Sequence, residues 1–231
     1  WDLMTKWLDK LTAYDLSGVD TAGCASIDEW LERLEAQSPL QLVTSSGTTG
    51  TFSFIPKDEP ITVQGMRIWK MMVFQTFGKE PTEDELNPVV DVIWPNFSSG
   101  RFGMTRMVPW IKREFTGGDE SRFHALYSGS MDTDLMFLAN KMRAAAAKGE
   151  LGRLELDPKL AARKEEFIAL QMRQMTEVPE FIARLTNELR GRRVFMTNTY
   201  NLMYNLAAAG LAEGAHADFA PGFVGGVQWV A

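Results

Sequence analysis

Residues 44–51 read Thr-Ser-Ser-Gly-Thr-Thr-Gly-Thr and directly follow the apolar run Leu-Gln-Leu-Val at 40–43. Glycine permits a positive φ and lets the backbone come close to a ligand. A turn of this composition can direct several main-chain N–H groups at one point, which suits phosphate oxygens. The Ser and Thr hydroxyls add hydrogen-bond donors around it. The segment therefore predicts a nucleotide-phosphate site, and the alternative is a polar surface turn that binds nothing, because these residue types are common in loops.

Two other phosphate motifs do not fit this segment. The Walker pattern, counted from Gly47, requires a second glycine where Phe52 stands. The dinucleotide fingerprint Gly-x-Gly-x-x-Gly fails because Thr49 occupies its second glycine position. The cation that follows the loop is Lys57, in the pair Pro56-Lys57.

The string Ser-Ser-Gly-Thr-Thr-Gly after a strand-like run resembles the phosphate loop of the adenylate-forming (AMP-binding) superfamily, in its phenylacetate-CoA ligase and acyl-protein synthetase branches. The resemblance implies an enzyme that binds ATP and Mg²⁺ and lets a carboxylic acid attack ATP, giving an acyl-adenylate and pyrophosphate. The acyl group would then pass to a thiol of coenzyme A or of an acyl carrier. The residues implied to hold the ATP phosphates or to shape the turn around them are Thr44, Ser45, Ser46, Gly47, Thr48, Thr49, Gly50, Thr51 and Lys57.

The chain departs from this family at the end of the loop. The family commonly reads Gly-x-Pro-Lys there, whereas Gly50 is followed by Thr51, Phe52 and Ser53. Ser53 thus stands at the position of the expected lysine. This leaves open a non-catalytic module that binds a nucleotide or another anion. A third reading is an interaction protein whose loop has no ligand.

The resemblance extends from about residue 26 to the end of the chain, and the family's later motifs would follow Ala231. Residues 1–231 are therefore expected to form the N-terminal portion of an adenylation domain, without the C-terminal domain that carries the catalytic lysine. Such a piece is expected to be inactive by itself. The sequence assigns no catalytic residue within it.

Composition excludes several classes of protein. The net charge of −6 gives no basic field that would attract nucleic acid. The sequence contains no run of 18 apolar residues, so no membrane-spanning helix is predicted. Cys24 is the only cysteine, which excludes a disulfide framework and a multi-cysteine zinc site and is compatible with a cytoplasmic location. The two histidines, His124 and His216, do not lie in a ligand-spaced cluster, so we expect structural or surface roles and no metal centre.

The pattern of elements predicts an α/β domain with a mainly parallel sheet flanked by helices, the partial N-terminal domain of an acyl-adenylate synthetase. The first expected helix is capped at Ser26 and has Ile27, Trp30, Leu31 and Leu34 on one face. Asp132 or Thr133 is expected to cap a helix over Asp134–Lys148, and a helical region over 158–190 is expected to be interrupted at Pro179. The other expected helices are Thr62–Phe77 and Tyr200–Leu211. Expected strands are Leu40–Val43, Ser53–Ile55, Val89–Trp94 ended by Pro95, Phe123–Tyr127, Arg193–Thr197 and Val224–Val230. Asn96–Gly103 is expected to be a loop, either ligand-contacting or an ordinary connector.

Overall fold

A computed structural model describes residues 1–45, 52–75, 89–197, 200–212, 218–221 and 226–230. The chain forms two compact units. The first consists of residues 1–63, 100–106 and 131–170, and the second consists of residues 64–99, 107–130 and 171–231. Each unit has a buried apolar cluster, so each is described by itself.

The first unit combines a β-hairpin with short and medium helices. Its elements are α1 (Asp2–Asp9), α2 (Ile27–Gln37), β1 (Gln41–Thr44), β2 (Phe54–Lys57), α6 (Thr133–Ala147), the 3-10 helix η2 (Leu151–Arg153) and α7 (Pro158–Ala162). The predicted capping box starts α2. The Ser26 hydroxyl accepts from the Glu29 N–H at 3.1 Å, and the Glu29 carboxylate accepts from the Ala25 N–H at 2.7 Å. The first bond satisfies an N–H that the start of a helix leaves without a backbone partner, and the second holds the residue before the cap.

Trp30 is at the centre of the first unit's core. Its side chain has no exposed surface, and its indole N–H donates to the Thr5 hydroxyl at 2.9 Å. Trp1 stacks on it at 5.3 Å, and Phe54 of β2 meets its edge at 5.1 Å. The face predicted from sequence is confirmed, because all four of its residues are buried: Ile27, Trp30, Leu31 and Leu34.

The second unit contains a five-stranded sheet in the order β4-β3-β5-β7-β6. Its strands are β3 (Asp91–Gly100), β4 (Phe123–Met131), β5 (Val194–Thr197), β6 (Asp218–Pro221) and β7 (Gly226–Val230). Strands β4, β3 and β5 run parallel, whereas β7 is antiparallel to both β5 and β6. The α/β class is therefore confirmed, and the parallel part of the sheet is its β4-β3-β5 portion.

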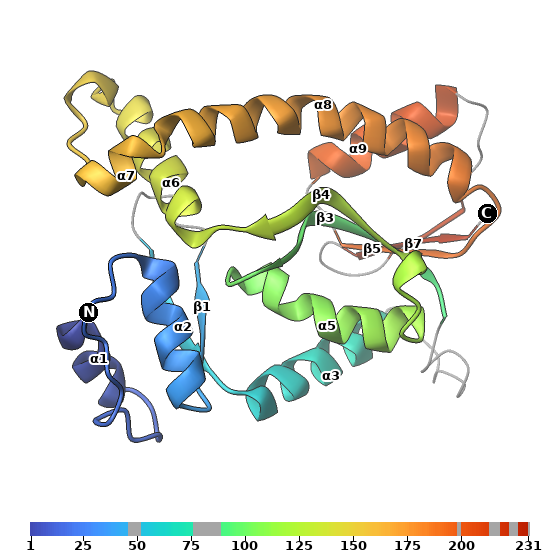
Figure 1. Ribbon diagram of the computed structural model, residues 1–231. Coiled ribbons are helices and arrows are strands. Elements are labelled where there is room, and N and C mark those ends of the chain that lie inside the picture. The colour runs from blue at the N-terminus through green and yellow to red at the C-terminus, as the bar shows by residue number, and fades with distance from the viewer. Residues whose placement is uncertain (46–51, 76–88, 198–199, 213–217, 222–225, 231) are drawn as a thin grey trace. The chain divides into compact units, whose positions relative to one another are not determined.

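Helices cover both faces of this sheet (Figure 1). The helices that cover it are α5 (Gly103–Thr116), α8 (Lys164–Glu188) and α9 (Tyr200–Ala212), and the 3-10 helix η1 (Glu120–Arg122) precedes β4. Helix α3 (Glu59–Gln75) contacts α5 through an ion pair between Lys70 and Glu114 at 2.9 Å. Helices α8 and α9 lie on one face and α5 on the other. The α8–α9 side has a buried cluster that includes Phe181, Leu185, Met196 and Leu202. On the α5 side, Phe115 stacks on Phe195 with 4.2 Å between ring centroids.

Pro95 does not end a strand, so the predicted boundary at Trp94 is wrong. Strand β3 continues to Gly100, and most of the expected loop Asn96–Gly103 is therefore strand. The physical reason lies in the register. Among the described residues, β3 pairs with β5 from Asp91 to Ile93, so the N–H that proline lacks is not required for that ladder.

Pro179 does not interrupt the helical region either. Helix α8 runs through it from Lys164 to Glu188, and the break falls at Arg163, between α7 and α8. A proline inside a helix removes one hydrogen bond. The buried residues Phe181, Ile182 and Leu185 follow directly and hold the C-terminal half of α8 in the core.

The other predicted helices are confirmed with shifts of a few residues. Helix α3 begins at Glu59, three residues earlier than expected, because the Asp58 carboxylate accepts from the Ile61 N–H at 2.8 Å. The apolar residues of this segment exceed one helical stripe, which predicts burial on more than one side of the helix. That prediction is wrong for Ile68 and Met71, which are 59% and 57% exposed. Helix α6 is capped by Asp132, whose carboxylate accepts from the Leu135 N–H at 2.8 Å.

Gly149 ends α6 with a φ of +70° and has open space where a Cβ would stand. We predict that Gly149→Ala lowers the free energy of unfolding by about 1 kcal/mol, because an L-residue is strained in this conformation. Gly152→Ala is the matched control, since Gly152 also has open space but no positive φ. Urea unfolding of both variants tests this, and equal stabilities would contradict it.

Candidate nucleotide-phosphate site

The hydroxyl-rich segment connects the two strands of the β1–β2 hairpin. The strands are antiparallel, and Thr44 pairs with Phe54 at the end nearest the connection. Beyond this pair, the Ser45 N–H donates to the Ser53 carbonyl at 2.9 Å, and the Ser53 N–H donates to the Ser45 hydroxyl oxygen at 2.9 Å. The two ends of the segment are thus hydrogen-bonded to each other at Ser45 and Ser53.

The base of this turn lies beside the start of α5. Thr44 forms a parallel bridge with Phe102, and its N–H donates to the Arg101 carbonyl at 3.3 Å. A Cβ on Gly103, the first residue of α5, would lie only 3.1 Å from a Val43 methyl, so glycine permits this approach. The first N–H groups of a helix lack partners within the helix, and the helix dipole places partial positive charge there. The turn therefore begins next to a backbone environment that favours an anion.

Of the predicted loop, the structure describes Thr44 and Ser45. Thr44 is 1% exposed, and its hydroxyl donates to the Arg101 carbonyl at 3.5 Å. Ser45 is half-buried and, with one lone pair used by Ser53, keeps its O–H as a donor. The predicted contacts of Ser46, Gly47, Thr48, Thr49, Gly50 and Thr51 lie outside the described residues.

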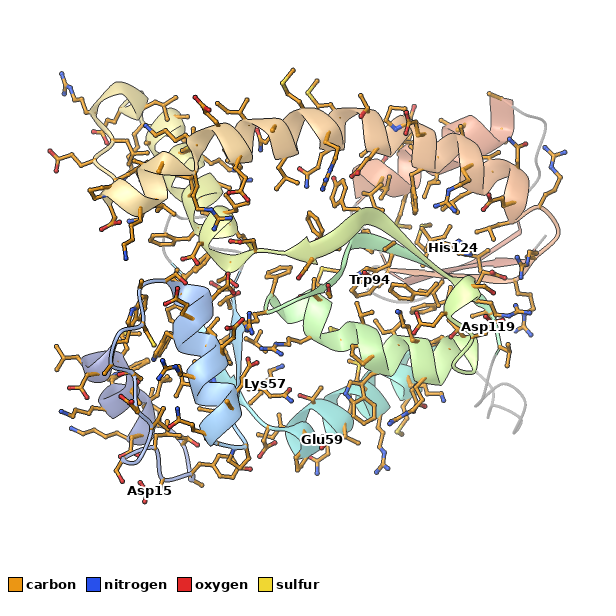
Figure 2. The ribbon with its side chains drawn as sticks, in the orientation of Figure 1. Asp15, Lys57, Glu59, Trp94, Asp119 and His124 are labelled. Atoms are coloured by element: carbon orange, nitrogen blue, oxygen red, sulfur yellow. The ribbon has the colours of Figure 1, made fainter. Side chains whose placement is uncertain are left out.

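Lys57 lies at the far end of the hairpin from the turn (Figure 2). It pairs with Gln41, three residues beyond the Thr44–Phe54 pair. At the rise of a β-strand this separates Lys57 from the turn by about 10 Å along the ladder. The structure therefore brings Thr44 and Ser45 together at the base of the turn but does not place Lys57 beside them.

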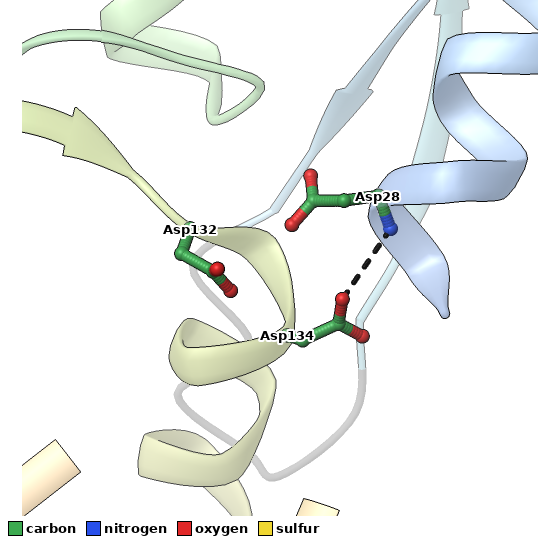
Figure 3. Close-up of side chains that lie close together, drawn as sticks. All are labelled: Asp28, Asp132 and Asp134. Carbon is green, nitrogen blue, oxygen red and sulfur yellow. Dashed lines mark hydrogen bonds between the residues drawn. The ribbon is translucent and has the colours of Figure 1, made fainter. Parts of the chain in front are cut away.

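Three carboxylates that the sequence analysis did not bring together meet where two helices begin (Figure 3). One oxygen each of Asp28, Asp132 and Asp134 lies within 4.8 Å of the others. Asp28 belongs to the first turn of α2, Asp134 belongs to the first turn of α6, and Asp132 is the cap of α6. A carboxylate trio of this size could in principle hold a divalent cation.

The hydrogen bonds assign a different role to these carboxylates, because each helix caps the other. Asp28 accepts from the Thr133 N–H of α6 at 2.8 Å, and Asp134 accepts from the Ile27 N–H of α2 at 3.1 Å. Arg101 contacts Asp28 at 3.1 Å, and Arg163 holds Asp132 through two bonds, of 3.0 Å and 2.9 Å. The carboxylates thus satisfy helix N–H groups and offset the positive ends of two helix dipoles. Sequence reasoning found the caps of both helices but not that they face each other.

The Asp134 carboxyl should give the stability of the protein a distinctive pH dependence. Burial raises its pKa above the ordinary value, and the charges of Asp28 and Asp132 add to the increase, against the effect of the Ile27 and Asp28 N–H donors. A raised folded-state pKa means that the folded state binds the proton more tightly. The stabilisation from Asp134 is therefore full below its unfolded-state pKa and is lost as pH rises through the folded-state value.

We therefore predict that the free energy of unfolding of the wild type falls relative to that of Asp134→Asn as pH rises from about 4 to about 7. Urea unfolding at each pH measures it. Asp15→Asn is the control, because Ser17 donors lower the pKa of Asp15 and its contribution is lost only as pH falls below the ordinary value. If the free energy of unfolding of the wild type instead rose relative to that of Asp134→Asn as pH rises, the assignment would be contradicted.

An ionic cluster around a buried carboxylate of the second unit was also missed from sequence. Asp91, at the start of β3, is 1% exposed, and three cationic or imidazole groups contact its carboxylate. They are Arg122 at 3.3 Å, Arg192 at 3.0 Å and His124 at 3.1 Å. His124, labelled in Figure 2, is itself buried, which agrees with the structural role expected for it. His216 lies outside the described residues.

Within the described part of the chain, no helix combines the length and apolar character needed to cross a bilayer. The comparisons with known proteins give no family assignment. No protein-family model, no curated protein and no solved structure matches this chain.

Proposed function

We propose that the segment 45–51, which begins at Ser45, cradles the phosphates of ATP, and that the full-length protein uses this site to activate a carboxylic acid as an acyl-adenylate. Thr44 is not included, since its N–H and hydroxyl donate to the Arg101 carbonyl and its side chain is buried. The observation that carries the proposal is the placement of the turn. A Ser/Thr/Gly-rich segment closes a hairpin whose base is hydrogen-bonded at Ser45 and Ser53 and bridged to the start of α5 at Phe102. Hydroxyl donors, glycines and a helix N-terminus are the groups that bind phosphate in proteins.

In this proposal the chain contributes binding and orientation. Main-chain N–H groups and hydroxyls of the turn hold the phosphates, while the carboxylate of the substrate attacks the α-phosphorus and pyrophosphate leaves. Such reactions depend mostly on positioning and on stabilising charge, rather than on covalent chemistry by the protein. Mg²⁺, when bound with ATP, would neutralise phosphate charge. The acidic trio Asp28, Asp132 and Asp134 is not assigned to Mg²⁺, since its oxygens are engaged by N–H groups and arginines. A thiol of coenzyme A or of an acyl carrier would accept the acyl group.

The second candidate is a module that binds a nucleotide or another anion without turnover. The position of Lys57 favours it, because Ser53 occupies the place of the expected loop lysine and Lys57 lies at the opposite end of the hairpin. Both candidates share the phosphate cradle. They differ in whether a cation reaches the transferred phosphate.

Titration with ATP and Mg²⁺ tests the shared cradle. We expect saturating ATP to stabilise the wild-type chain by about 2–3 kcal/mol, which raises its melting temperature by several degrees. Replacing Thr48 and Thr49 together by alanine should weaken ATP binding about tenfold, because it removes two hydroxyl donors to charged oxygens. Thr176→Ala is the matched control, since Thr176 is exposed on α8 and its hydroxyl only bonds the Arg173 carbonyl.

Exchange of ³²P-pyrophosphate into ATP by the full-length protein then separates the two candidates. Exchange that depends on one member of a carboxylic-acid panel supports the synthetase. ATP binding without exchange for any acid supports the non-catalytic module. No heat and no thermal shift with ATP would reject both and leave the turn without a nucleotide ligand.

A further inference from the structure

A cavity of about 490 Å³ lies along β4 in the second unit. Strand β4 is at the end of the strand order of the described sheet, so no described strand covers this side of it. Residues of β4 form the floor, α8 forms one wall, and Lys112 of α5 with Glu120 of η1 forms another. The volume falls within the range typical of sites for small organic ligands.

The cavity presents aromatic rings to cations. Phe123 and Tyr127 from β4 and Phe181 from α8 line it. The Lys112 ammonium lies 5.0 Å from the centre of the Phe123 ring, and the Arg184 guanidinium lies 5.5 Å from the centre of the Phe181 ring. Both distances are within the range of cation–π attraction, so ring faces in this cavity already attract positive charge.

Carboxylates outnumber cations among the lining residues, with three against two. Lys112 is paired with Glu120, and Arg184 contacts Glu188 at 3.2 Å. Both cations are therefore occupied by acidic partners. Glu180, on the α8 wall, forms no ion pair with any other residue that the structure describes.

Tyr127 lies close enough to the Glu177 carboxylate to be affected by its charge. Tyr127 is half-buried, and burial raises its pKa above the ordinary value. The negative charge of Glu177 raises that pKa further, although Arg173 contacts Glu177 at 3.2 Å. The phenol therefore keeps its proton and can donate a hydrogen bond.

We propose that this cavity binds an organic amine, a ligand with a primary ammonium group on an aromatic or aliphatic body. The ammonium would pair with the Glu180 carboxylate on the α8 wall, where Glu177 adds negative charge. The apolar body would rest against Phe123, Tyr127 and Phe181. The proposal does not depend on the phosphate site, because every residue it uses belongs to the second unit and no nucleotide is involved.

A series of three probes of similar size separates charge from shape. Phenethylammonium, 2-phenylethanol and phenylmethanesulfonate share a phenyl ring but carry positive, zero and negative charge. Titrations followed by protein NMR, without nucleotide, should show phenethylammonium binding about tenfold more tightly than the alcohol. Its largest shifts are expected at β4 and α8. The sulfonate should bind most weakly.

Variants at Glu180 tie the preference to this wall. The side chain is exposed, so substitution there should not disturb the core. Glu180→Gln should weaken phenethylammonium binding by about threefold, and Glu180→Lys should make the sulfonate the preferred probe. Glu155→Gln, the same change at an exposed residue outside the cavity, should leave binding unchanged. Equal binding of all three probes, tighter sulfonate binding, no binding of phenethylammonium at millimolar concentration, or an unaltered Glu180→Gln variant would each overturn the proposal.

Discussion

Replacing Asp91 by alanine should lower the free energy of unfolding by about 2–3 kcal/mol, because hydrogen bonds to a charged group are lost while Arg122 and Arg192, 30% and 41% exposed, keep access to water. The carboxylate is 1% exposed, and three side chains from different parts of the sequence contact its two oxygens. Its loss leaves Arg122 and Arg192 repelling each other without the anion between them. It also leaves the buried His124 ring without its hydrogen-bond partner.

Urea unfolding of the wild type and the variant measures this effect, and Asp119→Asn is the control. Asp119 also contacts Arg122, at 3.4 Å, but its side chain is 50% exposed. Water screens such a pair, so its loss should cost less than about 1 kcal/mol. If Asp91→Ala cannot be purified folded, Asp91→Asn keeps the shape and removes only the charge. A cost below about 1 kcal/mol for both Asp91 variants would mean that the cluster contributes little to stability.

The helices predicted best from the sequence are those in which the spacing of apolar residues and the capping residues indicate the same boundaries. Helix α2 has a capping box at Ser26 and an apolar face from Ile27 to Leu34, and the structure buries that face. Helix α6 similarly combines the cap Asp132 with Gly149 at its end. In both cases local propensity and tertiary burial specify the same boundaries, so no long-range information is needed.

The failures occurred where tertiary contacts override local signals. Helix α5 was not predicted, because Gly103 starts it and Pro109 lies inside it, and both residue types weaken a helix. Its buried residues Val108, Ile111 and Phe115 recur at helical spacing and were the signal that could have found it. The extension of β3 past Pro95 depends on which neighbours it pairs with, and a single sequence does not state them.

The candidate site shows the same division. The order of residues in the turn is local information, so its chemistry could be read from Thr44 to Thr51. The approach of Gly103 to Val43 and the position of Lys57 depend on pairing and register. The acidic trio was invisible as a group, since Asp28 and Asp134 are 106 residues apart and meet only because their helices begin at the same place.

Asp28→Ala should lower the free energy of unfolding by about 2 kcal/mol, because it removes the acceptor of a helix N–H and a partner of an arginine. The Thr133 N–H donates to this carboxylate at 2.8 Å and Arg101 donates to it at 3.1 Å. Asp28→Asn keeps one acceptor oxygen in the same position. Asparagine and aspartate cap helices about equally well, so the Asn variant should lose less than about 1 kcal/mol.

This pair of substitutions separates a capping role from a metal-binding role. An amide oxygen can replace a carboxylate as a helix cap but is a much weaker ligand for a divalent cation, because it lacks the charge. We therefore expect that millimolar Mg²⁺ or Ca²⁺ does not change the differences in free energy of unfolding between the wild type, Asp28→Asn and Asp28→Ala. If Ca²⁺ stabilised the wild type alone and the two variants were equally unstable, the three aspartates would be metal ligands, and the reciprocal caps of α2 and α6 would be a secondary consequence of that site.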